Sequence, residues 1–397
     1  MIRPVLVSFA RTPIAKFRGS LSSLKAPELG AIATRAALER TGSSDIEIKE
    51  AFLGNVVSAG IGQAPCRQAV LGAGLPNSVV CTTINKVCAS GMKSVMLASQ
   101  MIQCGGLTNS TDALLAGGFE SMSNIPHYLM GSRSGTALGH TQLIDGVIHD
   151  GLWDVYNNQH MGMCAEICSQ TYGISRQDQD AFAIESYKRA QKAIADGIFE
   201  SEIVSVEVPQ RRGDPIVVDT DEEPHSVNME KLSTLRPAFS KDGTVTAANA
   251  SSLNDGAAAM VLMAEDAALD LGLKPIARIL GCGDAAQDPV QFTTSPALAV
   301  PVAAKNAKVD ISDIEYHEIN EAFSVVALAN IELLKLDADK VNVFGGAVAM
   351  GHPIGMSGAR IIGSLYNVLK EKDSTIGCAS ICNGGGGASA IVIERLS

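Results

Sequence analysis

Two patterns of apolar and polar residues alternate along the chain. Short apolar runs, such as RPVLVSF, DALLAGG, AAAMVLM and ASAIVIE, are typical of strands that are buried on both faces of a sheet. Between them lie Ala-rich stretches whose apolar residues recur every three or four positions, which predicts helices. The alternation therefore indicates an α/β protein in which helices cover both faces of a mixed or parallel sheet.

The same succession of patterns occurs twice. Residues 28–56 and 296–323 each begin with an Ala-rich helix, continue through a link containing Ser-Asp-Ile-Glu and a short strand, and reach the letters EAF or NEAF. Farther on, residues 112–123 and 375–390 each form an apolar strand that runs into glycines. We therefore predict two similar halves, residues 1–120 (completed by about 245–270) and 271–397.

Residues 121–245 have a different character, with Met- and Gly-rich loops followed by a charged stretch. They also contain one strongly predicted helix, with Ser175 as N-cap, Asp178 three residues later and Gly197 at its end. Long insertions in compact α/β proteins usually cover a site or an interface. We expect this segment to be a loop domain with that role.

Composition narrows the class of protein. Of the 397 residues, 46% are hydrophobic and 18% are charged, which indicates a well-buried globular chain. A net charge of −11 argues against nucleic acid as a general partner, and the absence of a long apolar run argues against a membrane span. Nine scattered Cys without zinc-site spacing indicate a reducing compartment. Because the N-terminus leads directly into a strand pattern, we expect a cytoplasmic protein; a removed presequence, and hence the mitochondrial matrix, is the alternative.

The stretch NKVCASGMKS places Cys88 between a predicted strand and a predicted helix. A helix N-terminus aimed at the sulfur would favour the thiolate, and Ser90 and Gly91 would leave room for a substrate. The alternative is a buried Cys that packs as a small hydrophobic residue.

Three further stretches could carry chemistry. His352 lies between Gly351 and Pro353, although an isolated His is more often structural. Cys382 precedes a run of glycines whose N–H groups could stabilise an oxyanion, or which could form only a turn. Asn320 and Glu321 follow a strand; the alternative for them is a helix start, with Asn320 as cap and Glu321 in the first turn.

Seven motifs, in order, resemble those of the thiolase family, and within it those of the acetyl-CoA C-acetyltransferases. They are NKVCASGMKS, AGGFESMSN, DGLWDVYNNQHMG, GTVTAANASSLNDGAAA, NEAF, GGAVAMGHPIGMSGAR and CNGGGGAS. The resemblance covers the whole chain. It implies two βαβαβαββ halves in a five-layered αβαβα arrangement, with a loop domain inserted in the first half.

The resemblance also implies roles for individual residues. Cys88 would take an acyl group as a thioester and His352 would activate its thiol. Cys382 would move a proton to and from the acetyl methyl carbon or the leaving CoA. Asn320 would hold a water that polarises the substrate carbonyl, and the N–H groups of Cys88 and Gly384 would receive the second oxyanion.

Binding residues are implied in the same way, and two sets are expected. Contacts with coenzyme A are expected from Leu152, His160, Met161, Tyr187, Ser226, Val227, Asn228, Lys231, Ala247, Ser251 and Phe323. A potassium ion near the coenzyme, as in some members, is expected at Tyr187, Ala247, Ala248, Ala250 and Val348. The alternatives are a solvated surface side chain for Lys231 and a core side chain for Tyr187.

The implied activity is the reversible condensation of two acetyl-CoA to acetoacetyl-CoA plus CoA by ping-pong acyl-cysteine chemistry. The alternative is a broader 3-ketoacyl-CoA thiolase of fatty-acid or isoleucine breakdown. A thiolase-like binding protein without chemistry is disfavoured because Cys88, Asn320, His352 and Cys382 are all present. The resemblance also implies a homotetramer, built as a dimer of dimers, with residues 121–140 as the expected assembly loop. It fits enzymes of the mevalonate pathway and enzymes of ketone-body metabolism alike.

Overall fold

Strand β1 (Pro4–Arg11) illustrates how the apolar runs of the sequence are buried. In the computed structural model, which describes residues 2–107, 109–135 and 138–397, every residue of this strand is buried. Val5 and Val7 contact an apolar cluster on one face of the sheet, whereas Leu6 and Phe9 contact another on the opposite face. Because neighbouring side chains of a strand point to opposite faces, a strand covered on both faces is mostly apolar, and the two polar residues of β1, Ser8 and Arg11, form buried hydrogen bonds.

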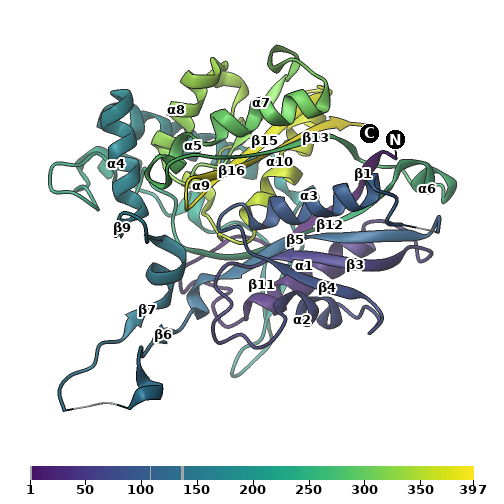
Figure 1. Ribbon diagram of the computed structural model, residues 1–397, viewed down its shortest axis with the longest axis horizontal. Helices are drawn as coiled ribbons and strands as arrows, with labels where there is room; N and C mark the ends of the chain where they lie inside the picture. Colours follow the sequence, from purple (N-terminus) through teal and green to yellow (C-terminus); the bar gives the residue numbers. More distant parts are fainter. Residues whose placement is uncertain (1, 108, 136–137) are drawn as a thin grey trace.

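The apolar clusters separate five layers, αβαβα, which confirms the predicted arrangement (Figure 1). One outer layer covers the strands of the first half, two central helices lie between the strands of the two halves, and the other outer layer covers the strands of the second half. The outer helices of the first half are α1 (Ala26–Glu39) and α2 (Pro65–Gly72). The central helices are α3 (Ser90–Gln103) and α10 (Ser357–Glu371). The outer helices of the second half are α7 (Pro296–Ala307) and α8 (Ser324–Leu334).

Within the described residues, the strands of both halves join into one sheet of ten strands. The order is β14-β15-β16-β13-β1-β12-β5-β3-β4, with β2 paired to β12. The halves meet where Val5 of β1 lies opposite Arg278 of β13. The strands of the first half are β1, β2 (Ala15–Lys16), β3 (Glu47–Gly54), β4 (Val80–Ile84), β5 (Asp112–Ser121) and β12 (Asn254–Ala264). Those of the second half are β13 (Ala277–Ala286), β14 (Tyr316–Ile319), β15 (Ile376–Asn383) and β16 (Gly387–Arg395).

The predicted internal repeat is present, with two differences. The counterpart of β4 in the second half is reduced to a single bridge between His317 and Val341. The shared letters EAF are not equivalent: residues 50–52 lie inside β3, whereas residues 321–323 follow the end of β14. The register of the strands aligns Gly54 with Ile319 instead, because they lie opposite Gly118 of β5 and Ser380 of β15. Asn55 is therefore the counterpart of Asn320.

Glycines bring the two central helices into backbone contact. A Cβ atom on Gly91 of α3 would lie 2.9 Å from the Ala359 nitrogen of α10, and one on Gly358 would lie 2.5 Å from the Met92 nitrogen of α3. Side chains at these positions would force the helices apart. Because Cys88 lies two residues before α3 and His352 lies in the loop that leads into α10, this crossing brings the two loops to the same pocket.

The segment between the halves contains α4 (Met161–Tyr172) and α5 (Arg176–Ala195). The predicted cap of α5 is confirmed, since Ser175 accepts a hydrogen bond from the Asp178 nitrogen and Gly197 follows in the left-handed region. The remaining strands here are β6 (His127–Tyr128), β7 (Ile144–Asp145), β8 (Trp153–Asp154), β9 (Gln159–His160), β10 (Val206–Val208) and β11 (Ile216–Val218). Short helices elsewhere are α6 (Glu265–Asp270) and α9 (Ala347–Met350).

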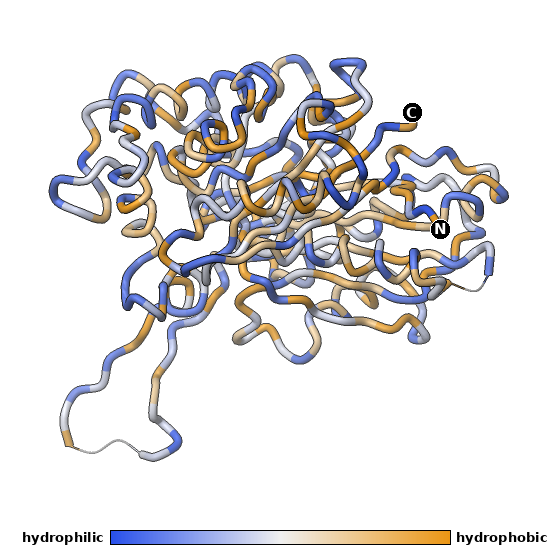
Figure 2. Tube along the Cα trace, turned by 45° about the horizontal axis from the view of Figure 1, so that its top comes forward, coloured by the Kyte–Doolittle hydropathy of each residue, from blue (hydrophilic) through white to orange (hydrophobic). Residues whose placement is uncertain are grey.

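An arm built on β6 and β7 projects from the body of the molecule (Figure 1) and carries both hydrophobic and hydrophilic stretches (Figure 2). It contains most of the predicted assembly loop, of which residues 136 and 137 lie outside the described residues. The domain boundaries at 120, 245 and 271 stay predictions. Every helix of the described residues falls short of the length and apolar character that a membrane span requires.

Candidate active site

Cys88 lies in the turn between β4 and α3, as predicted. Ser90 shapes this turn: its hydroxyl accepts a hydrogen bond from the Lys86 nitrogen at 2.8 Å and donates one to the Val87 carbonyl at 2.6 Å. Val87 is held at φ +48°, a left-handed conformation that is strained for a β-branched residue. Ser90 and Gly91 are buried against neighbouring backbone, so the expectation that they leave room for a substrate is wrong.

The expected effect of the helix N-terminus on Cys88 is outweighed by desolvation. Burial raises the pKa of the Cys88 thiol to about 11, although the N–H groups of Gly384 and of Cys88 itself oppose the rise. A charged thiolate is costly where water is excluded. In this structure Cys88 is therefore a thiol, and it needs a base at the moment of reaction.

His352 lies in the loop between α9 and α10. Gly351 precedes it at φ +99°, where a Cβ atom would collide with the Asn254 side chain. Asn254 accepts a hydrogen bond from the His352 nitrogen at 2.9 Å. The glycine beside His352 is thus required by the chain's own packing as well as by any ligand.

Ser357 fixes the tautomer of His352. The Ser357 hydroxyl donates to the Pro353 carbonyl at 3.0 Å, so it accepts from His352 Nδ1, which lies 2.6 Å away. The proton is then on Nδ1, and the Nε2 lone pair faces Asn320 Nδ2 at 3.5 Å. Burial, with the Arg360 guanidinium as a second cause, lowers the pKa of His352 to about 3. A neutral imidazole with an unprotonated Nε2 can accept a proton.

Asn320 follows β14, with Nδ2 at 3.5 Å from Nε2 of His352. Its Oδ1 is buried and has no hydrogen-bond partner among the described residues. Such an atom requires a partner, and a water molecule or a ligand would provide one. The helix-start alternative is wrong, since α8 begins only at Ser324 with Phe323 as N-cap. Glu321 instead accepts from Ser186, Asn342 and the Val348 nitrogen.

Cys382 lies near the end of β15 with no exposed surface. Burial, followed by the nearby Cys88, raises the pKa of Cys382 well above its ordinary value. The glycines that follow form the turn to β16, and Gly385 and Gly386 adopt positive φ angles of 85° and 87°. This turn brings the Gly384 N–H to the sulfur of Cys88.

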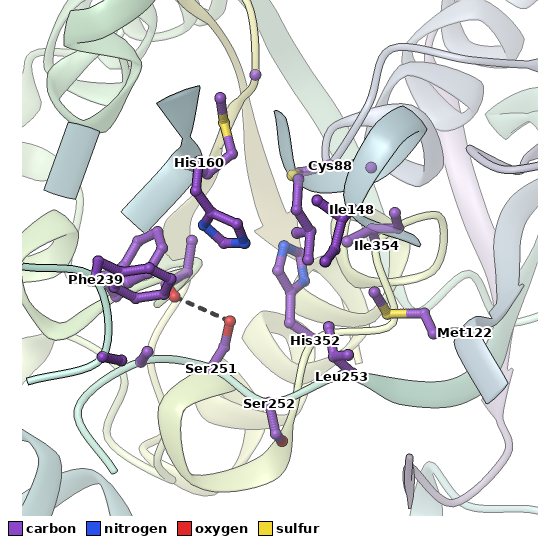
Figure 3. A pocket seen from close by; sticks show the side chains of 18 of the residues that line it. Cys88, Met122, Ile148, His160, Phe239, Ser251, Ser252, Leu253, His352 and Ile354 are labelled. Carbon is purple, nitrogen blue, oxygen red and sulfur yellow. Dashed lines mark hydrogen bonds between the residues drawn. The ribbon is translucent and has the colours of Figure 1, made fainter. Parts of the chain in front are cut away.

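Three of these residues, Cys88, His352 and Gly384, line one pocket of about 430 Å³ (Figure 3), whereas Asn320 and Cys382 are buried and lie outside its wall. The predicted residues that line it are Cys88, Leu152, His160, Met161, Ala247, Ala250, Ser251, Phe323, His352 and Gly384. Phe239 closes one wall, where its ring stacks on His160 with centroids 4.7 Å apart. The Ser251 hydroxyl donates to the Ala322 carbonyl at 2.9 Å, which is the dashed contact of Figure 3. The pocket is therefore mostly apolar, with a few polar side chains, among them His160, Ser251 and His352.

Several predicted binding residues lie elsewhere. Ser226, Val227, Asn228 and Lys231 are on short helical turns outside the pocket wall, and of these only Val227 is partly buried. Tyr187 is buried in the core, in the same apolar cluster as Ala248 and Val348. Burial, followed by the Glu223 and Glu321 carboxylates, raises the pKa of the Tyr187 hydroxyl.

Comparison with known proteins decides the family. A family model described as "Thiolase, N-terminal domain" matches residues 4–266, and one described as "Thiolase, C-terminal domain" matches residues 273–395. The chain belongs to the thiolase family. It is 53% identical over 392 residues to "Acetyl-CoA acetyltransferase ERG10, cytosolic" of Gibberella zeae, covering 98% of each chain. It is 54% identical over 393 residues to "Acetyl-CoA acetyltransferase, mitochondrial" of Xenopus tropicalis, covering 99% of this chain and 92% of the relative.

A solved thiolase structure has the same fold. The Acat5 thiolase of Ascaris suum, in complex with coenzyme A, superimposes with a TM-score of 0.93 at 44% identity. The match covers 99% of this chain and 100% of that one. The two-halved five-layered fold is thus a thiolase fold, as the resemblance implied.

Some residues of this thiolase site were not predicted from the sequence. Ser357 could have been found, because the pair Ser-Gly occurs at the start of both central helices, in ASGMK and MSGAR. The unpredicted pocket residues are Val87, Met122, Ile148, Gly151, Ala238, Phe239, Thr246, Ser252, Leu253, Phe292, Ala322 and Ile354. Most are apolar residues in loops that no pattern distinguishes from other loops.

Proposed function

We propose that this thiolase is an acetyl-CoA C-acetyltransferase, which catalyses the reversible condensation of two acetyl-CoA to acetoacetyl-CoA plus CoA. The observation that carries the proposal is a single pocket that contains Cys88, the His352 imidazole and the Gly384 loop. Relatives that share more than half of its residues over nearly the whole chain are named acetyl-CoA acetyltransferases.

The first half-reaction forms an acetyl-enzyme. His352 Nε2 takes the proton of the Cys88 thiol, and the sulfur attacks the thioester carbonyl of acetyl-CoA. The carbon–sulfur bond to CoA breaks, and Cys382 protonates the departing CoA thiolate. The raised pKa of Cys382 makes the resulting thiolate a strong base, which suits its role in the second half-reaction. The N–H groups near Cys88 and Gly384 stabilise the tetrahedral oxyanion.

The second half-reaction forms the carbon–carbon bond. The Cys382 thiolate takes a proton from the methyl group of a second acetyl-CoA, and negative charge moves to its thioester oxygen. A water on Asn320 Oδ1 and the protonated His352 donate hydrogen bonds to that oxygen. The carbanion attacks the acetyl group on Cys88, acetoacetyl-CoA leaves, and His352 returns its proton to the Cys88 sulfur.

Substrate comparison tests this function. We expect rapid thiolysis of acetoacetyl-CoA and much slower thiolysis of a long-chain 3-ketoacyl-CoA, measured as loss of substrate absorbance. Incubation with acetyl-CoA should add one acetyl mass to Cys88. A preference for the long chain would instead identify the broader 3-ketoacyl-CoA thiolase, and the absence of any acetyl-enzyme would identify a binding protein without chemistry.

Coenzyme A is proposed to lie with its pantetheine along Leu152, His160 and Ser251. His160 accepts from the Gly162 nitrogen through Nδ1 at 3.0 Å, which leaves Nε2 available to a ligand amide. Met161, Ala247 and Phe323 would supply apolar contacts in the same pocket. The nucleotide end is proposed to reach Ser226, Val227, Asn228 and Lys231. If Lys231→Ala leaves the KM for acetyl-CoA unchanged, the contact with Lys231 is absent.

A potassium site is proposed at Tyr187, Ala247, Ala248, Ala250 and Val348. The donor set fits this ion, because backbone carbonyls and a neutral phenol are hard oxygen ligands and the Glu223 and Glu321 carboxylates lie close to Tyr187. The ion would order the loop that carries Ala247, a pocket residue. Replacement of KCl by NaCl should raise the KM and lower the melting temperature, and no change in either would exclude the site.

Assembly and compartment are further parts of the proposal. We propose a homotetramer, a dimer of dimers, in which the projecting arm makes the contact between dimers; Leu129, Met130 and Leu143 of this arm are exposed. Analytical ultracentrifugation of the chain with and without residues 126–146 tests this. We propose a cytoplasmic location, although the names of the relatives include both cytosolic and mitochondrial forms.

A further inference from the structure

Glu120 is a buried carboxylate for which the reaction described above has no use. It lies near the end of β5 with 1% of its surface exposed. Burial raises its pKa to about 7, against the opposing effect of the N–H groups that bond to it. Burying a carboxylate costs free energy unless it is hydrogen-bonded. The groups that bond to Glu120 therefore indicate its role.

The partners of Glu120 belong to two loops, one from each half. In the loop after β3, Oε1 accepts from Asn55 Nδ2 at 2.9 Å and from the Val57 nitrogen at 3.2 Å, and Oε2 accepts from the Val56 nitrogen at 2.9 Å. In the second half, Gly355 lies against the carboxylate, since a Cβ atom on Gly355 would lie 2.6 Å from Oε2. Gly355 is three residues after His352, so Glu120 ties the His352 loop to the first half.

The internal repeat shows which residue of the second half corresponds to Glu120. Glu120 lies two residues beyond Gly118 in β5, and Cys382 lies two residues beyond Ser380 in β15, so the two are counterparts. The glycines at the helix crossing align Gly91 with Gly358, and hence Cys88 with Gly355. The proximity of Glu120 to Gly355 is thus the counterpart of the proximity of Cys382 to Cys88. One of these two pairs consists of two cysteines, whereas the other consists of a carboxylate and a glycine.

We propose that Glu120 is a positioning residue of the condensation reaction: its carboxylate fixes the His352 loop against the loop after β3 and thereby sets the approach of His352 Nε2 to Cys88. The inference rests on the proposed function. A carboxylate is required because all of the partners are N–H donors, and only an acceptor-only group can receive every one of them. The groups that titrate beside it are Cys88 and, on the anchored loop, His352.

The test compares Glu120→Gln with Glu315→Gln. Glu315 is the control, because it also accepts backbone N–H bonds, from Thr375 at 2.7 Å and Ile376 at 3.0 Å, but these residues lie at the start of β15 and not in the His352 loop. In Glu120→Gln the side-chain NH2 group replaces an accepting oxygen and faces N–H donors, so we expect the His352 loop to shift. Since a displacement of about 1 Å can cost roughly a hundredfold in rate, we expect kcat to fall about ten- to a hundredfold while KM changes less than about threefold.

A second readout separates positioning from mere stabilisation. The Glu120 carboxylate contributes to the raised pKa of Cys88, so its removal should move the pH profile of Cys88 alkylation by iodoacetamide to lower pH. Glu315→Gln should leave both kcat and this profile as in the wild type. A folded Glu120→Gln enzyme whose kcat and alkylation profile both match the wild type overturns the inference.

If Glu120→Gln does not fold, the test uses Asn55→Ala instead, which removes one of the N–H donors to Glu120. Its kcat should fall about three- to tenfold with an unchanged KM, and a wild-type kcat in this variant overturns the inference. Failure of the proposed function is a separate result: in that case the wild-type chain itself does not convert acetoacetyl-CoA and CoA into acetyl-CoA.

Discussion

The two halves of the molecule place the same elements around the pocket but use them differently. Asn55 follows β3 and Asn320 follows β14 at equivalent points of the sheet. The Asn55 amide is saturated, since Nδ2 donates to Glu120 and to the Phe119 carbonyl while Oδ1 accepts from Ser58. Asn320 retains a buried Oδ1 without a partner among the described residues. Asn55 therefore stabilises the loop after β3, whereas Asn320 keeps an oxygen atom available for a ligand.

The central helices show the same division of roles. Ser90 and Ser357 stand at equivalent starts of α3 and α10, and each hydroxyl donates to a carbonyl in the loop before its helix. Ser90 accepts from the backbone of its own loop, whereas Ser357 accepts from the His352 ring. The two halves thus build equivalent loops before α3 and α10. Differences at single positions make the first loop the site of the nucleophile, Cys88, and the second the site of the base, His352.

The largest expected effect separates the two thiols. Cys88→Ser should lose roughly ten-thousandfold or more in turnover, because it removes the covalent intermediate. Cys382→Ser should lose condensation too, yet still take an acetyl group on Cys88, since it retains the nucleophile and His352. Intact-protein mass spectrometry after incubation with acetyl-CoA distinguishes the two. If Cys382→Ser loses the acetyl adduct and Cys88→Ser retains it, the assignment is reversed.

The next effect compares the two asparagines. Asn320→Ala should lower kcat roughly a hundred- to a thousandfold, the usual result of removing one oxyanion donor, here the bound water. Its effect on unfolding should be small, because Oδ1 makes no bond in the described chain. Asn55→Ala should instead lower the free energy of unfolding by about 1–3 kcal/mol, because it leaves Glu120 short of a donor. Steady-state kinetics and urea unfolding measure both; equal effects of the two variants in both assays would contradict the contrast.

A smaller effect is expected at the two serines. Ser357→Ala leaves His352 without the partner that fixes its tautomer, so kcat should fall roughly tenfold with little change in melting temperature. Ser90→Ala should cost about 1 kcal/mol of stability and change kcat less than about threefold. Parallel kinetics and thermal unfolding check this, and a larger loss of kcat in Ser90→Ala would show that the Cys88 loop depends on its serine more than the His352 loop does.

Sequence patterns predicted most strands and helices, since periodicity is a local property, and the resemblance to the thiolases supplied the candidate reactive residues. The patterns did not predict the contacts between residues that are far apart in the sequence. No local pattern shows that the space beside Gly351 is needed by Asn254, almost a hundred residues earlier in the chain. Gly91 is needed by α10 and not by a substrate. The raised pKa of Cys88 follows from burial by both halves, which no local pattern contains.

The smallest expected effect concerns the pH at which the two catalytic cysteines react. Because burial raises the pKa of Cys88 to about 11, its alkylation by iodoacetamide should rise about tenfold for each pH unit above 7 and level off only near pH 11. Cys382 has a still larger upward shift and no exposed surface, so it should be alkylated later. Peptide mapping of both sites over time checks the order. A plateau for Cys88 below pH 8 would mean that a preformed thiolate, favoured by the N-terminus of α3, exists before any substrate binds, and that His352 is not needed to draw the proton away.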